Sequence, residues 1–179
     1  MKFFTADLHF YHKLAASMRG YDNVDDMNNE IIHNLNMTLY KDDDELYILG
    51  DLSFGNIEKT DELLKQLPFR KYLILGNHDN IKKLNKLAHH FEWIKEYYKL
   101  RISEADIKYR LILSHYPMMT WDNAHHGSWM LHGHCHGNLK APETTRIDVG
   151  WDVFKRPVGF PDIKFYMQNR KYITVDHHD

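Results

Sequence analysis

The sequence alternates short apolar runs with amphipathic stretches, and this alternation restricts the chain to an α/β fold. In the segment 24–39, Met27, Ile31 and Leu35 recur at helical spacing behind two aspartates in the first turn. The expected strands are residues 2–6, 45–49, 71–75, 93–102, 108–114, 129–132, 145–149 and 171–175. The expected helices are residues 24–39, 60–67, 80–90 and 161–169. No repeat, low-complexity tract or linker interrupts the pattern, so we expect a single domain over residues 1–179.

Composition narrows the class of protein. A chain of 179 residues with 43% hydrophobic and 27% charged residues can bury a continuous core. The apolar runs have strand length and the N-terminus lacks the apolar core of a signal peptide, so we expect no membrane association. The one cysteine, Cys135, is typical of a reducing compartment, which predicts a cytoplasmic protein. The formal charge of −2 does not indicate a strongly basic nucleic-acid surface.

Polar residues with metal-binding side chains follow five of the expected strands, three times directly behind a glycine. Because ligands of α/β folds bind at the carboxyl ends of strands, we expect these side chains to gather at one edge. A glycine before the polar residue lets the chain turn sharply and approach a bound group closely. The residues are Asp7, His9, Asp51, Asn77, His78, Asp79, His115, His134 and His136.

The chemistry of these side chains favours transition metals. Carboxylate, amide and imidazole groups together suit Mn²⁺, Fe, Zn²⁺ or Ni²⁺ better than Ca²⁺. A structural zinc site usually recruits several cysteines, and this chain has one. Each residue alone has an ordinary explanation as a turn or surface residue, but the set at five strand ends favours a metal centre.

The ordered motifs Asp7-x-His9, Gly50-Asp51, Gly76-Asn77-His78-Asp79, His115 and Gly133-His134-Cys135-His136 resemble the five motifs of the calcineurin-like metallophosphoesterases. These motifs span residues 7–136, about three quarters of the chain. They resemble in particular the motifs of small single-domain members of the family from bacteria and phages. The resemblance implies a four-layer α/β/β/α sandwich of two mixed sheets, the metallo-dependent phosphatase fold.

The resemblance also implies the site. Two divalent transition-metal ions would bind, with Mn²⁺ expected first and Fe, Zn²⁺ or Ni²⁺ as alternatives. A hydroxide that bridges the two ions would attack the phosphorus of a phosphodiester or phosphomonoester. His78 would protonate the leaving group, and Asp79 would hydrogen-bond His78 and orient it. The implied ligands are Asp7, His9 and His136 for one ion, Asn77, His115 and His134 for the other, and Asp51 between them.

Four further residues are weaker candidates for substrate contact. His12 follows His9 closely, and Arg19 could grip a phosphate in a bidentate manner. Trp121 and His126 fall in or beside a polar segment that we expect to form a loop near the site. The alternative for each is an ordinary surface or packing role.

Two other functions are consistent with the same motifs. One is a nuclease that acts on DNA or RNA, against which stand the small size and the lack of an obvious basic groove. The other is a metal-binding scaffold for protein interaction without activity, against which stands the complete motif set, His78 included. The expected partner is a phosphate-ester substrate, with nucleotides as one candidate, and no obligate nucleic-acid partner is indicated. The sequence does not indicate an oligomeric state.

Overall fold

The computed structural model describes residues 1–141 and 143–175 and contains two mixed sheets. In the first sheet the strand order is β4 (Trp93–Lys95), β3 (Arg70–Ile74), β2 (Glu45–Leu49), β1 (Lys2–Thr5) and β9 (Val158–Gly159). Strands β1 to β4 are parallel and β9 is antiparallel to β1. The second sheet has the order β5 (Tyr97–Glu104), β6 (Ile107–Ser114), β7 (Trp129–His132) and β8 (Arg146–Asp148). Strand β6 is antiparallel to β5 and parallel to β7.

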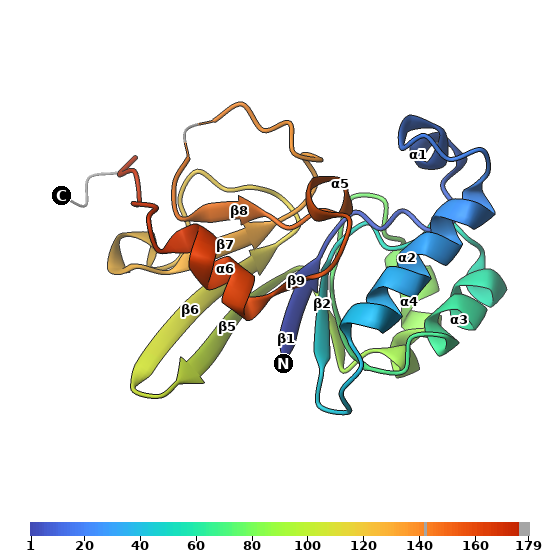
Figure 1. The fold of residues 1–179 in the computed structure, drawn as a ribbon, viewed down its shortest axis with the longest axis horizontal. Coiled ribbons are helices and arrows are strands. Elements are labelled where there is room, and N and C mark those ends of the chain that lie inside the picture. Colours follow the sequence, from blue (N-terminus) through green and yellow to red (C-terminus); the bar gives the residue numbers. More distant parts are fainter. Residues whose placement is uncertain (142, 176–179) are drawn as a thin grey trace.

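Figure 1 shows the two sheets facing each other, and apolar side chains of both form one buried cluster between them. Phe4 and Leu49 of the first sheet pack in one cluster with Leu111 and Leu131 of the second. On the other face of the first sheet lie α2 (Val24–Thr38), α3 (Ile57–Lys65) and α4 (Ile81–Lys86). The fourth layer is thin, because the other face of the second sheet is covered by the short 3-10 helix η2 (Ala124–His126) and neighbouring side chains. The predicted sandwich of two mixed sheets with helices is confirmed.

The helix predicted over 24–39 is confirmed almost to the residue. The Asn23 side chain accepts hydrogen bonds from the backbone N–H groups of Asp25 and Asp26, which satisfies the free donors of the first turn. Met27, Ile31 and Leu35 form the buried stripe of this helix. The remaining helices are α1 (Lys13–Met18), α5 (Trp151–Phe154), α6 (Phe160–Met167) and the 3-10 helix η1 (Ala88–His90). Within the described part of the chain, no helix is both long and apolar enough to cross a bilayer.

Three sequence predictions differ from the structure. The single strand expected over 93–102 is two strands in different sheets, because Trp93–Lys95 pairs with β3 whereas Tyr97–Glu104 pairs with β6. The helix expected over 80–90 is interrupted at Leu87, whose ψ of 8° ends α4 before η1 begins. The strand expected over 171–175 is absent, and the Ile173 backbone N–H donates instead to the Thr144 hydroxyl.

Candidate metal centre

The predicted residues are brought to one edge of the two sheets by the carboxyl ends of β1, β2, β3, β6 and β7. A backbone hydrogen bond from Asp7 to Gly50 joins the ends of β1 and β2. Another, from Gly133 to His115, joins the ends of β7 and β6. The two sheets meet where the His134 backbone N–H donates to Asp7 Oδ2 across 2.9 Å. The expected gathering of strand ends is therefore present.

Two of the preceding glycines allow carboxylates to approach the backbone. A Cβ on Gly76 would lie 2.2 Å from Asp51 Oδ1, and one on Gly133 would lie 2.5 Å from Asp7 Oδ2. Both distances are far shorter than a van der Waals contact, so any side chain at either position would displace a carboxylate. This is the close approach for which glycine was expected at these strand ends.

The carboxylates of Asp7 and Asp51 are held in the same manner. One oxygen of each accepts a backbone hydrogen bond, Asp7 Oδ2 from His134 and Asp51 Oδ1 from His78, both at 2.9 Å. The second oxygen faces imidazoles. Asp7 Oδ1 lies 4.0 Å from Nε2 of both His9 and His136. It is buried and has no hydrogen-bond partner among the described residues, although a buried carboxylate oxygen normally has one.

Asp51 lies between two groups of imidazoles. Its Oδ2 is 3.8 Å from His9 Nε2 and 3.6 Å from His115 Nε2. The same His115 Nε2 lies 2.9 Å from the Asn77 side-chain oxygen, which is also 2.9 Å from His134 Nδ1. Two sets of three candidate donors, Asp7 with His9 and His136, and Asp7 with Asp51 and His115, each lie within 4.8 Å of one another. These distances fit cations placed between the side chains, since metal–ligand bonds in such sites are about 2.0–2.2 Å.

The backbone is strained at the same residues. A positive φ is uncommon for residues other than glycine and costs on the order of 1–3 kcal/mol where it occurs. Five predicted ligands adopt it, with φ between 48° and 70°: Asp7, His9, Asp51, His134 and His136. Concentrated strain of this kind is typical of functional sites, where the surrounding structure holds side chains in a required direction.

Burial shapes the electrostatics of the site. Desolvation raises the pKa of Asp7 to about 6 and lowers the pKa of His9 to about 3. Desolvation also lowers the pKa of His134. Each shift disfavours a charged side chain in the metal-free protein. A cation at this position would compensate the buried carboxylates and would meet neutral imidazoles, which are the form that binds metals.

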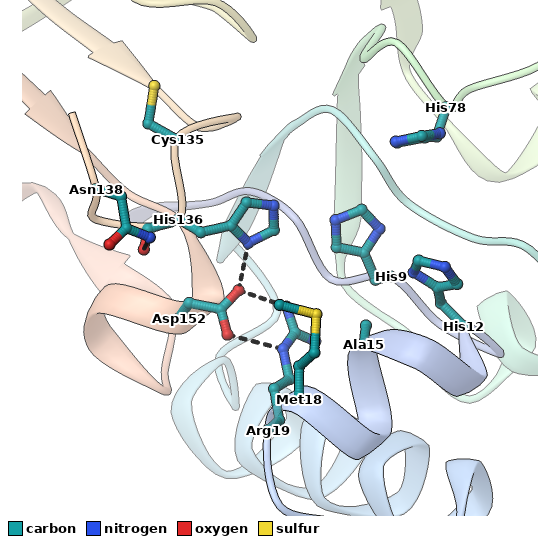
Figure 2. A pocket seen from close by; sticks show the side chains of 10 residues that line it. All are labelled: His9, His12, Ala15, Met18, Arg19, His78, Cys135, His136, Asn138 and Asp152. Carbon is teal, nitrogen blue, oxygen red and sulfur yellow. Dashed lines mark hydrogen bonds and ion pairs between the residues drawn. The ribbon is translucent and has the colours of Figure 1, made fainter.

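His136 is held by a residue that the sequence analysis missed. The Asp152 carboxylate lies 2.6 Å from His136 Nδ1, and its two oxygens accept hydrogen bonds of 2.8 and 2.7 Å from Arg19 (Figure 2). The hydrogen bond to Asp152 raises the pKa of His136. Asp152 follows Val149-Gly150 after β8, so it carries the same strand–glycine signal that marked the other residues.

The structure corrects the prediction for Arg19. Its side chain is 4% exposed, and the guanidinium donates to the carbonyl oxygens of Asp7 and Leu8 as well as to Asp152. These bonds occupy the guanidinium, so it cannot grip a phosphate in the expected bidentate manner. Arg19 instead fixes the backbone of Asp7 and Leu8 at the end of β1.

The predicted orientation of His78 by Asp79 is also wrong. The Asp79 carboxylate accepts backbone N–H bonds from Asp51, Leu52 and Gly76 at 2.9 to 3.0 Å, and none of the described hydrogen bonds joins it to His78. Asp79 therefore holds together the turns after β2 and β3. His78 is exposed, and its ring centroid lies 5.9 Å from that of His9.

Two predicted substrate contacts lie away from the site. Trp121 is 7% exposed, packs with Ile112 and Met130, and donates its indole N–H to the Ser128 carbonyl. It belongs to the core because the loop folds its aromatic ring inward. His126 is exposed in η2 and does not line the pocket at the metal site.

His12 does lie in that pocket, stacked on Phe54 with ring centroids 3.9 Å apart. Phe54 is 42% exposed and its centroid is 5.1 Å from that of His78, a position that the sequence did not indicate. The pocket has a volume of about 380 Å³. Its lining, shown in Figure 2, is His9, His12, Ala15, Met18, Arg19, His78, Cys135, His136, Asn138 and Asp152.

Comparisons with known proteins agree with this arrangement. The family model for calcineurin-like phosphoesterases matches residues 3–178. The Gene 66 proteins of Mycobacterium phages L5 and D29 are 29% and 27% identical to this chain. The matches cover 89% and 90% of this chain and 90% and 92% of those proteins.

A protein of unknown function from Aquifex aeolicus, AQ665, has a crystal structure similar to this one. The TM-score is 0.69 and the sequences are 25% identical, over 93% of this chain and 98% of that one. The family match and the clustered aspartate and histidine side chains together support a metal-dependent phosphoesterase. The chain belongs to the calcineurin-like phosphoesterase family.

Proposed function

We propose that this protein hydrolyses phosphodiesters or phosphomonoesters with two divalent transition-metal ions, Mn²⁺ being the first expected. The observation that carries the proposal is the position of Asp51 Oδ2. It lies within 4 Å of His9 on one side and of His115 on the other, while Asp51 Oδ1 is held by the His78 backbone. A carboxylate in this position can serve two neighbouring ions at once.

The remaining ligands divide into two groups around Asp51. Asp7, His9 and His136 would hold one ion, which is supported by the unpartnered Asp7 Oδ1 between the two imidazoles. Asn77, His115 and His134 would hold the other, which is supported by the convergence of both imidazoles on the Asn77 oxygen. The donor set contains oxygen and imidazole nitrogen without thiolate, which suits Mn²⁺, Fe, Zn²⁺ or Ni²⁺.

The protein's own contribution is to position the substrate and to move a proton. When bound, two such ions would supply positive charge to the phosphoryl oxygens and lower the pKa of the attacking water. His78 is exposed at the rim of the pocket, where its imidazole can reach the leaving oxygen of an ester. We assign it the role of general acid, which donates its proton as the bond between phosphorus and the leaving oxygen breaks.

The pocket favours diesters at least as much as monoesters. Among its ten lining residues the one permanently cationic side chain is Arg19, and Asp152 and two carbonyl oxygens occupy it. A second negative charge on a monoester would therefore find little compensation from the described side chains of the pocket. We expect small diesters to be hydrolysed at least as well as the corresponding monoesters.

The test combines metal content with activity. After reconstitution with Mn²⁺, elemental analysis should find close to two equivalents in the wild type, and Asp51→Asn should lose metal and activity together. His126→Ala is the matched control, because it removes an exposed histidine outside the pocket. Metal content near zero in the wild type, or binding unaffected by Asp51→Asn, would contradict the proposal. Metal binding without turnover on a broad panel of mono- and diesters would favour a scaffold, and turnover of nucleic acid alone would favour a nuclease.

A further inference from the structure

A second cluster of metal-binding side chains lies far from the pocket. It consists of Asp61 in the middle of α3 and of His89 and His90 in η1. Both elements precede parallel strands of the first sheet, α3 before β3 and η1 before β4. The cluster therefore lies toward the amino-terminal edge of these strands, whereas the candidate metal centre lies at their carboxyl ends.

The two imidazoles converge on one oxygen of the Asp61 carboxylate. Asp61 Oδ1 is 2.7 Å from His90 Nε2 and 3.5 Å from His89 Nε2. All three donor atoms lie within 4.8 Å of one another. The His90 side chain is 10% exposed and that of His89 is 63% exposed, so the cluster is anchored on one side and open to solvent on the other.

The second oxygen of Asp61 is held away from the histidines. Asp61 Oδ2 forms an ion pair with Lys65 at 2.5 Å, one turn further along α3. Lys65 and His90 lower the pKa of Asp61 to about 2, so the carboxylate remains ionised at any physiological pH. An oriented, ionised carboxylate with one oxygen directed at two imidazoles is a typical ligand arrangement, because a partner of the second oxygen fixes the first.

From this geometry we propose that Asp61, His89 and His90 form a third metal site, which binds one transition-metal ion of the Zn²⁺, Ni²⁺ or Cu²⁺ type. Two imidazoles and one carboxylate suit these ions and do not suit Ca²⁺ or Mg²⁺, which require oxygen ligands. A surface hollow of about 480 Å³, lined in part by His89 and His90, leaves room for water to complete the coordination. The bound ion would tie α3 to the turn that enters β4.

The chain contains its own matched control for this site. The sequence Ala-His-His also forms η2, where the rings of His125 and His126 are tilted against each other with centroids 4.1 Å apart, the same separation as between His89 and His90. Within the described part of the chain, no carboxylate joins the η2 pair in a group of three donors. The two 3-10 helices thus present the same adjacent histidines, and among the described residues a group of three donors forms at η1.

The experiment is equilibrium dialysis against buffered Zn²⁺, followed by elemental analysis of the wild type and of variants. We expect Asp61→Asn and His89→Ala each to bind one equivalent less than the wild type, whereas His125→Ala/His126→Ala should bind the same amount. His177 and His178 are present in every variant and cancel in these differences. His89→Ala is the safer variant, because its mostly exposed side chain contributes little to packing.

Repeating the substitutions in an Asp51→Asn background separates this inference from the proposed function. The equivalent lost through His89→Ala should be the same in both backgrounds, whatever Asp51→Asn itself removes. The proposal is wrong if Asp61→Asn and His89→Ala retain the full wild-type zinc content. It is equally wrong if the η2 double variant loses the same equivalent, since adjacent exposed histidines alone would then explain the binding.

Discussion

Asp152 Oδ2 lies 2.6 Å from His136 Nδ1, and this contact leaves His136 Nε2 as the nitrogen that faces Asp7. The two partners are 16 residues apart and come from the short helix α5 and the turn after β7. A carboxylate behind a ligating histidine fixes its tautomer and ring direction, which is a common arrangement in metal sites. Asp152 also pairs with Arg19, so one carboxylate links His136, a proposed ligand, to the backbone of Asp7 and Leu8.

Substitution of Asp152 should therefore weaken metal binding without removing a ligand. We expect Asp152→Asn to lower the affinity for Mn²⁺ by about 10- to 100-fold, because an amide holds the imidazole less firmly than a carboxylate does. A titration of metal-free protein measures this. Glu104→Gln is the control, since it removes a carboxylate paired with Lys164 outside the site. An unchanged affinity would show that His136 does not depend on Asp152.

His78→Ala separates proton donation from metal binding. Both ions should remain bound, because His78 is not among the proposed ligands. Turnover of an ester with a poor leaving group should fall by about 100- to 10,000-fold, the usual contribution of a general acid. An activated aryl ester should lose less, since its leaving group needs little protonation. Loss of metal would identify His78 as a ligand, and equal losses on both esters would point to phosphate binding instead.

Asp79→Asn should lower the stability of the folded protein rather than impair proton donation by His78. An asparagine can accept from the N–H groups of Asp51, Leu52 and Gly76 only through one oxygen, and its own N–H₂ would face a donor. Hydrogen bonds to charged groups contribute about 1.5–3 kcal/mol, so we expect the free energy of unfolding to fall by about 2–4 kcal/mol. Urea denaturation measures this, with Asp106→Asn in the exposed β5–β6 turn as the control. If Asp79→Asn kept the full unfolding free energy and lost turnover only on esters with poor leaving groups, the prediction that Asp79 orients His78 would be correct after all.

Lys71 predicts a pH dependence of stability. It is 6% exposed, its ammonium donates to the carbonyls of Leu67 and Phe69, and burial lowers its pKa to about 8 from 10.5. Between pH 8 and 10.5 the unfolded chain keeps this proton and the folded chain releases it, so stability rises with pH. The shift corresponds to about 3 kcal/mol over that interval.

Lys71→Met should lack this rise, because it removes the titrating group. The difference in unfolding free energy between wild type and Lys71→Met, measured by denaturant titration at pH 7.5 and 10.5, should shift by about 3 kcal/mol in favour of the wild type. Lys86→Met is the matched control, since Lys86 is an exposed lysine at the end of α4. A difference that is constant with pH would contradict the prediction.

The sequence by itself determined the order of elements and the chemistry at the strand ends. The alternation of apolar runs with amphipathic stretches is a local pattern, and a strand followed by glycine and a polar residue turns at the same place in any α/β sheet. For this reason the helix from Val24 and the positions of Asp7, Asp51, His115 and His134 could be predicted from the sequence. The strand predicted over 145–149 is also followed by a glycine, Gly150, so the same signal could have indicated Asp152, which lies two residues beyond it.

The tertiary structure alone decided which side chains meet across the chain. Arg19 and Asp152 are separated by 133 residues, and local sequence carries no information on such a pair. The same applies to Asp79, whose carboxylate is satisfied by backbone groups of another strand end, and to Trp121, which turned inward to the core. A continuous apolar alternation over 93–102 also cannot show that the chain crosses from one sheet to the other, because both strands have the same period. Which side chains and strands pair depends on packing between segments that are distant in the sequence. The periodicity of apolar residues carries information only about residues close together in the sequence.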